Sequence, residues 1–308
     1  MVNSGGGPTY KITADIQFLK KEILFFLVVA FLFSWSTMAL VWNSITPDFQ
    51  FGNRKAVEEL FGSTPMIYGF GPFISAIITT LLFRSKKDLK ALFRKVIEWR
   101  VSYKWYLVAL FLPSLLQWLG LLIWSYFSGT SVVWPNMGSY VSSWLGTGLL
   151  GATLYYISEE LGWRGFLQPR FLSFKNVLKS TFIFGVIWSV WHYPLWITST
   201  WLTSGSVGEA TLMVSSNTLL IISLTFFLTW IFKNTNGSIL LAMLFHGASM
   251  ASLAKIYALA GDSAVTEPFF IMTLAAVFMV AALILILVTT MNRDVAENDC
   301  EQRNIDAG

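Results

Sequence analysis

The 308-residue sequence contains little of what soluble enzymes commonly use for chemistry. It has one cysteine, Cys300, in a polar stretch near the C-terminus, and two histidines, His192 and His246. A single cysteine excludes a disulfide within the chain, and its position excludes a cysteine-rich metal site or a buried cysteine nucleophile. Charged residues make up 12% of the chain, against roughly 25% in soluble proteins. This scarcity excludes an ordinary soluble domain, and nothing in the sequence indicates nucleic-acid binding.

Hydrophobic residues are abundant instead: they make up 55% of the chain and give a mean hydropathy of +0.61. An apolar stretch of about 20 residues can cross the roughly 30 Å hydrocarbon core of a bilayer as a helix. Eight such stretches predict an all-α, polytopic membrane helical bundle, and they cover residues 23–44, 64–83, 105–128, 143–168, 179–200, 213–232, 238–258 and 268–291. The first is too long for the core of a signal peptide and is expected to remain as a span.

No repeat or linker divides the chain, so one transmembrane domain is expected at 11–291, with its motif core at 140–255. The polar ends, 1–10 and 292–308, are expected to be flexible tails. The segment RSKKDLKALFRKVIEWR, at 84–100, places apolar residues at helical spacing between Lys and Arg. This pattern predicts an amphipathic helix in the cytoplasmic membrane interface, which serves to orient the chain or to recruit a membrane-bound substrate.

Lys and Arg are distributed unevenly between the predicted connections. Of the 21, 18 fall in the two tails, in the even-numbered loops or at the adjoining helix ends, and only Arg54, Lys55 and Lys255 fall on the other side. The positive-inside rule therefore places both termini in the cytoplasm. We expect an integral protein of the plasma membrane, or of the endoplasmic reticulum membrane if the source is eukaryotic.

Two adjacent carboxylates, Glu159 and Glu160, interrupt the fourth predicted span in YYISEELGWRGFLQPR. An ionisable group inside a bilayer costs roughly 3 kcal/mol on insertion scales, so both glutamates need partners. Glu160 and Arg164 are four residues apart and share a helix face, which predicts an ion pair. Glu159, about 100° around the helix, is left to face a cavity or a histidine. In the purely structural alternative, both glutamates only pair with Arg164, with Arg170 or with each other.

The two histidines also lie inside predicted spans. At about 1.5 Å per residue, Glu159, His192 and His246 reach similar depths from the cytoplasmic ends of three helices. Because isolated burial of each group would be costly, we expect one polar cavity that opens to the cytoplasm. Trp188, four residues before His192, is expected to pack against its ring, and Pro194 is expected to loosen the helix and free a backbone carbonyl.

Paired carboxylates and imidazoles in a low-dielectric cavity are suited to hydrolysis. For peptide cleavage, Glu159 would activate a water molecule, with Glu160 and Arg164 tuning its charge and orientation. His192 and His246 would stabilise the tetrahedral intermediate. This chemistry needs no cofactor, although a zinc ion held by Glu159, His192 and His246 remains an alternative. The helical zinc motif HExxH is absent.

Three motifs resemble those of the CAAX-protease and bacteriocin-processing family, the Rce1-like and Abi group of intramembrane endopeptidases. EELGWR matches its EExxxR motif, WSVWH resembles its aromatic-xxx-His motif, and GSILLAMLFH resembles its small-residue lead-in to a histidine. The resemblance covers roughly 140–255. It implies an eight-helix core whose cytosolic cavity cleaves a peptide or lipidated protein at the bilayer. It also implies that Glu159 is the base, that Glu160 supports it, and that His192 and His246 form the oxyanion site.

One position departs from the family pattern. Many members carry an asparagine four residues after the third-motif histidine, and Met250 stands there in this chain. Ser249 or Asn217 would have to replace its amide; otherwise the chain is a weakened or non-catalytic member. The alternative function is therefore a non-proteolytic immunity or scaffold protein that keeps the cavity. A proton- or solute-coupled transporter is a third possibility, and the lack of an inverted repeat weighs against it.

Overall fold

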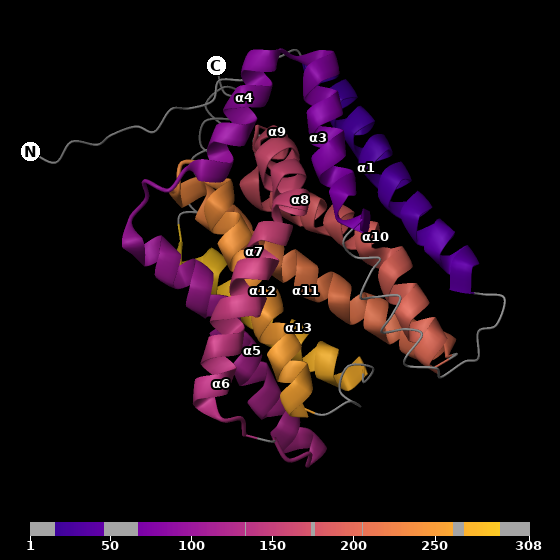
Figure 1. The fold of residues 1–308 in the computed structure, drawn as a ribbon, viewed down its shortest axis with the longest axis vertical. Coiled ribbons are helices and arrows are strands. Elements are labelled where there is room, and N and C mark those ends of the chain that lie inside the picture. The colour runs from indigo at the N-terminus through magenta and orange to yellow at the C-terminus, as the bar shows by residue number, and fades with distance from the viewer. Residues whose placement is uncertain are drawn as a thin grey trace, which may run out of the picture.

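The computed structural model describes residues 16–45, 67–132, 134–173, 176–204, 206–260 and 268–289, and these form helices and no strands. The predicted tails lie outside the described residues. The main helices, shown in Figure 1, are α1 (Ile16–Ile45), α3 (Phe70–Phe83), α4 (Lys86–Arg94), α5 (Tyr103–Ser128), α10 (Val177–Ser204), α11 (Val207–Asn234), α12 (Ile239–Ala260) and α13 (Pro268–Val288). The predicted class, an all-α membrane bundle, is confirmed.

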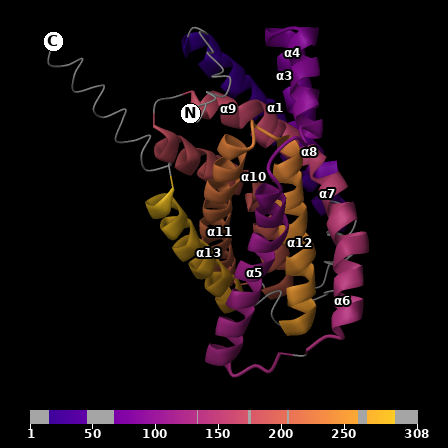
Figure 2. The same cartoon turned by 90° about the vertical axis from the view of Figure 1, so that its left-hand side faces the viewer.

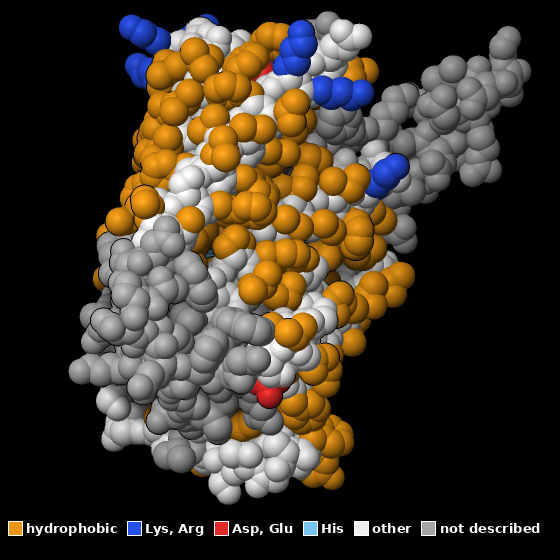
Figure 3. Space-filling model, turned by 90° about the vertical axis from the view of Figure 1, so that its right-hand side faces the viewer, with side chains coloured by type: hydrophobic (Ala, Val, Ile, Leu, Met, Phe, Trp, Pro, Cys, Tyr) orange, Lys and Arg blue, Asp and Glu red, His pale blue; other side chains and the backbone are white. Residues whose placement is uncertain are grey.

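Five of the described helices are long and apolar enough to cross a membrane. They are Ile16–Leu40, Tyr103–Ser128, Val207–Asn234, Ile239–Tyr257 and Pro268–Val288, and α3 is a shorter apolar helix. On the face shown in Figure 3, a broad hydrophobic belt covers the molecule, and most of the visible Lys and Arg side chains gather toward one end. The chain is therefore an integral membrane protein, while the count of eight spans stays a prediction.

The segment predicted as the fourth span is not a uniform α-helix. It runs through α6 (Met137–Ser143), η3 (Trp144–Gly151), α7 (Ala152–Tyr155), α8 (Ile157–Glu160), η4 (Leu161–Leu167) and α9 (Gln168–Leu172), of which η3 and η4 are π-helical. Several glycines lie in the two π-helical turns and weaken the preference for regular α-helix there. Such turns are rare and frequently mark functional sites. Glu159 and Glu160 end α8 directly before η4.

The helices that carry the two histidines pack near this segment. α12 lies between α5 and the column formed by α6 and α7 (Figure 2), and it contacts α5, η3 and α7. α10 packs along α11 and against α9. Large buried side chains from α1, η4, α10, α12 and α13 form one hydrophobic core, which includes Phe26, Trp163, Trp188, Phe245 and Phe278. The core thereby fixes the three sequence motifs relative to one another.

Close backbone contacts surround α3. Pro72 lies in the first turn of α3, where its missing N–H costs no helical hydrogen bond. A side chain at Gly71 would collide with Ala30 and Ser34 of α1, and one at Gly162 would collide with the backbone carbonyl of Pro72. These contacts confirm that small residues here allow helices to approach closely.

Replacing Gly162 with alanine is expected to destabilise the fold by about 1–3 kcal/mol, because the added methyl group meets the Pro72 backbone rather than a flexible side chain. Thermal unfolding in detergent measures the loss. Gly146→Ala is the matched control, since Gly146 lies in the other π-helical turn and its added methyl group would meet open space. Equal melting temperatures for the two variants would contradict the close contact between α3 and η4.

The amphipathic pattern at 84–100 is borne out as α4 and the following 3₁₀ turn, η2 (Lys95–Ile97). Ser85 caps α4: its hydroxyl accepts from the Asp88 amide, and the Asp88 carboxylate accepts from the Ser85 amide. The hydrogen bond from the Ser85 hydroxyl holds the pKa of Asp88 below its ordinary value. Leu92 is buried, whereas the four cations of α4 are exposed: Lys86, Lys87, Lys90 and Arg94. The position of α4 relative to the bilayer stays a prediction.

A buried carboxylate joins three segments near α4. Glu22 of α1 is fully buried and lies 2.6 Å from Nε of Arg84, directly after α3, and 3.4 Å from Nε of Arg170 in α9. The Arg170 guanidinium also donates to the backbone carbonyl of Phe166. Arg170 thus pairs with Glu22 and not with the two glutamates of the motif, contrary to one branch of the structural alternative.

Candidate active site

Glu160 is the centre of a buried ionic cluster. Nη1 of Arg164 lies 3.2 Å from Oε1 of Glu160, and both side chains are fully buried, as the four-residue spacing predicted. Nδ1 of His246 lies 2.7 Å from the same oxygen. Because a carboxylate oxygen only accepts hydrogen bonds, the hydrogen is assigned to Nδ1 of His246. Glu160 therefore ties the first motif to α12, 86 residues further along the chain.

Trp188 connects the remaining candidates. It is fully buried, and its indole N–H donates to Oε2 of Glu159 at 3.3 Å. Its backbone carbonyl accepts from Nδ1 of His192 at 2.9 Å, and its ring lies beneath the Arg164 guanidinium at 3.9 Å, within the range of a cation–π interaction. The predicted contact with the His192 ring is confirmed, with the ring centres 5.7 Å apart. The bond to Glu159 was not foreseen, although a buried indole N–H usually requires an acceptor.

Aromatic rings orient both imidazoles. Tyr156 stacks on His246 with the ring centres 3.6 Å apart, and Trp196 stacks on His192 at 5.1 Å with nearly parallel planes. In each histidine, Nδ1 is already used as a donor. Nε2 is therefore the ring nitrogen that each histidine can offer to a water molecule or a substrate.

The cluster is buried but keeps unused hydrogen-bonding capacity. Glu160 and Arg164 are fully buried, Glu159 is 5% exposed and His246 is 9% exposed, whereas His192 is partly exposed. Among the described residues, Oε2 of Glu160 and both Nε and Nη2 of Arg164 have no hydrogen-bond partner. Buried polar atoms of this kind are ordinarily satisfied by water or a ligand. The arrangement can thus hold polar reactants at the depth of the bilayer.

Three tyrosines surround Glu159. Tyr68, Tyr155 and Tyr156 lie close enough to its carboxylate for their hydroxyls to interact with it electrostatically. None of the three was predicted from the sequence, although Tyr155 and Tyr156 lie within four residues of Glu159 and could have been considered for that reason. Tyr68 lies two residues before α3, and no sequence signal connected it to Glu159.

The residues proposed to replace the family asparagine are engaged elsewhere. Met250 is 39% exposed on α12. The hydroxyl and carbonyl of Ser249 both accept from the Gln117 amide of α5, at 3.1 and 3.0 Å. The Asn217 amide donates to the carbonyl of Met213 in its own helix at 3.0 Å. None of these contacts brings an amide or a hydroxyl to Glu159 or to either imidazole.

The zinc alternative required Glu159, His192 and His246 to converge. In the part of the chain that the structure describes, no three His, Cys, Asp or Glu side chains lie close enough to hold a metal ion. The present arrangement of these side chains does not fit a zinc ligand set, and the steps proposed below are derived without a metal.

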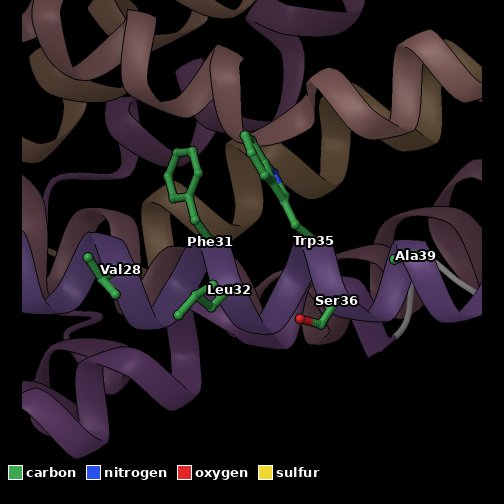
Figure 4. Close-up of a pocket in the computed structure, with 6 residues that line it drawn as sticks. All are labelled: Val28, Phe31, Leu32, Trp35, Ser36 and Ala39. Atoms are coloured by element: carbon green, nitrogen blue, oxygen red, sulfur yellow. The ribbon is translucent and has the colours of Figure 1, made fainter.

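An apolar groove of about 500 Å³ runs along α1 beside this region and is lined by Val28, Phe31, Leu32, Trp35, Ser36 and Ala39 (Figure 4). Phe31 and Trp35 extend from the same side of α1. The indole N–H of Trp35 donates to the backbone carbonyl of Trp191 at 3.1 Å. One wall of the groove therefore contacts the residue directly before His192.

The fold and this cluster define a class: a polytopic helical membrane protein with buried Glu, Arg and His side chains contributed by three helices. Residues 141–251 match the family model described as type II CAAX prenyl endopeptidase, Rce1-like. This segment therefore resembles the CAAX-protease and bacteriocin-processing family, and the match supports the resemblance that the three motifs indicated.

Curated relatives share parts of the chain. The chain is 32% identical over 98 residues to CAAX prenyl protease 2 of Methanococcus maripaludis, and these aligned residues are 32% of this chain and 35% of the relative. The chain is 26% identical over 230 residues to lysostaphin resistance protein A of Staphylococcus epidermidis, and this alignment covers 67% of this chain and 58% of the relative. The chain thus spans about one third of the length of the first relative and somewhat over half of the length of the second.

Proposed function

We propose that the protein is an intramembrane endopeptidase of the CAAX-protease type. It hydrolyses a peptide bond near the C-terminus of a membrane-associated or hydrophobic substrate, using water activated by Glu159. The observation that carries this proposal is the convergence of Glu159, Glu160, Arg164, His192 and His246 around Trp188. The match of 141–251 to the endopeptidase family model supports it.

In the first step, Glu159 removes a proton from water. Its Oε2 accepts from Trp188, so Oε1 is the oxygen that takes the proton. Because Nδ1–H of His192 donates to the Trp188 carbonyl, the neutral ring offers Nε2 as an acceptor. His192 thus accepts the second hydrogen of the water and directs its oxygen at the carbonyl carbon of the substrate. This role replaces the oxyanion role that the sequence suggested for His192.

In the second step, the new C–O bond produces a tetrahedral oxyanion. His246, protonated on both nitrogens, donates to it from Nε2, and the Glu160 carboxylate at Nδ1 offsets the positive charge. Arg164 holds the Glu160 carboxylate in place through their buried ion pair. Glu159 then passes its proton to the amide nitrogen and the C–N bond breaks. The products are a new carboxylate and a free amine.

The substrate class follows from the family. The model that matches is named for CAAX prenyl endopeptidases, so a prenylated peptide with a C-terminal CaaX sequence is the first substrate to test. The uneven Lys and Arg distribution supports a plasma-membrane protein with cytoplasmic termini and a site open to the cytoplasm. The partners are then the lipid bilayer and a lipidated protein or peptide.

Purified protein in lipid nanodiscs provides the test. Farnesylated and unmodified CaaX peptides are incubated with it, with and without a chelator, and products and bound metal are measured by mass spectrometry. The expected result is a shortened peptide in both conditions. No cleavage of either peptide would contradict the endopeptidase, and cleavage that is lost with chelator and restored by zinc would contradict a metal-free mechanism.

A second candidate is a non-proteolytic immunity or scaffold protein. Met250 in place of the family asparagine favours it, as does the likeness to the lysostaphin resistance proteins. A bacterial host that expresses Glu159→Gln separates the two functions. Protection from lysostaphin that survives the substitution supports the scaffold, whereas loss of protection supports proteolysis.

A further inference from the structure

The backbone carbonyl of Trp191, directly before His192, accepts hydrogen bonds from two other parts of the fold. One donor is the hydroxyl of Tyr68, before α3, and the other is the indole N–H of Trp35 in α1. Pro194, three residues later in α10, has no N–H and its ring crowds the preceding turn. Carbonyls in such a turn are available to outside donors. Two side chains therefore converge where the proline loosens α10.

The Tyr68 donor is held in position. Tyr68 is 2% exposed and packs its ring on that of Trp191, with the ring centres 4.4 Å apart. Ser34, one residue before Trp35 in α1, donates to the backbone carbonyl of Tyr68 at 2.8 Å. Neither Tyr68 nor Trp35 belongs to the segment that matches the family model. They join α1 and the start of α3 to one peptide unit of α10.

That peptide unit includes His192. The carbonyl of Trp191 and the amide nitrogen and Cα of His192 belong to the same planar peptide unit. Hydrogen bonds that fix the orientation of this carbonyl therefore also fix the position of the His192 Cα, to which the imidazole side chain is attached. The other contacts of the imidazole come from its own helix: Nδ1 bonds to the Trp188 carbonyl and the ring stacks on Trp196. These contacts move with α10. The position of the helix relative to Glu159 depends on the Trp188 indole one turn earlier and on the two bonds to the Trp191 carbonyl.

We propose that Tyr68 and Trp35 are positioning residues that hold His192 in register with Glu159 by clamping the carbonyl of Trp191. The catalytic part of this inference rests on the proposed endopeptidase function. Neither residue touches the reacting atoms: each acts through the peptide unit that carries His192. An enzyme that lacks the hydrogen bonds from Tyr68 and Trp35 to the Trp191 carbonyl still binds the peptide. Nε2 of its His192, however, no longer holds the water molecule at the angle needed for attack.

The test uses the fact that the chain has only two histidines. Protein labelled with ¹⁵N at the imidazoles gives one set of NMR signals for His192 and one for His246. In Tyr68→Phe and Trp35→Phe, the His192 signals are expected to shift while those of His246 stay in place. With the CaaX peptide, we expect kcat to fall roughly tenfold for each single variant and roughly a hundredfold for the double variant, with KM nearly constant.

Tyr106→Phe is the matched control, because it removes the same kind of bond, a tyrosine hydroxyl on a tryptophan carbonyl, at Trp99. It is expected to leave both histidine signals and kcat unchanged. Unchanged His192 signals in the double variant would overturn the proposal, and so would equal shifts of both histidines, which indicate a general loss of structure. If the wild type cleaves no peptide, the proposed function fails, while the NMR comparison still decides whether the clamp positions His192.

Discussion

Glu159→Gln is expected to lower kcat for peptide cleavage on the order of 10³-fold, with KM close to the wild-type value. Glutamine has the same shape as glutamate, and its amide oxygen can still accept from the Trp188 indole. It cannot take a proton from water, however, so only the proton-transfer step is lost. Steady-state kinetics on the farnesylated CaaX peptide measure both constants.

Glu209→Gln provides the control for this substitution. Glu209 lies in the first turn of α11, away from the candidate site, and the same change there is expected to leave kcat unaltered. Thermal unfolding of both variants near the wild-type temperature would show that the loss is catalytic. Wild-type kcat in Glu159→Gln would remove Glu159 from the role of base.

Arg164→Met is expected to destabilise the protein by about 3–5 kcal/mol, because it breaks a fully buried ion pair and leaves the Glu160 carboxylate bonded to His246 without the arginine. Methionine retains much of the side-chain volume against the Trp188 and Phe184 rings, so the effect isolates the charge. Adding Glu160→Gln to this variant is expected to restore part of the loss, since the second substitution removes the unpaired charge.

Thermal unfolding in detergent compares Arg164→Met and the double variant with Arg100→Met. Arg100 is exposed and lies over the ring of Trp99, so its loss is expected to change stability by less than about 0.5 kcal/mol. A melting temperature for Arg164→Met equal to that of Arg100→Met would contradict a buried ion pair. A double variant less stable than Arg164→Met would contradict the charge argument.

The parts of the site that sequence could predict are set by helix geometry. Residues four apart share a helix face, so the Glu160–Arg164 pair and the packing of Trp188 on His192 followed from spacing alone. The five helices that are long and apolar enough to cross a membrane followed from apolar length in the same way.

The parts that could not be predicted depend on tertiary packing. His246 bonds to Glu160 across 86 residues and Tyr68 bonds to Trp191 across 123, and no local pattern selects either pair. Arg170 was a candidate partner for the motif glutamates, but Glu22 of α1 pairs with it instead. The change from α-helix to π-helix in the motif segment also depends on contacts, since η4 packs on α3, α4 and α12.

The central claim is that water, activated at Glu159, cleaves a peptide inside the membrane domain. Its most direct test is a single-turnover reaction in H₂¹⁸O, with excess protein in liposomes, a farnesylated CaaX peptide and mass spectrometry of the new carboxylate. The account predicts one solvent oxygen in the product of the wild-type protein, and formation of that product on the order of 10³-fold more slowly by Glu159→Gln. Labelled product formed at the wild-type rate by Glu159→Gln would contradict it.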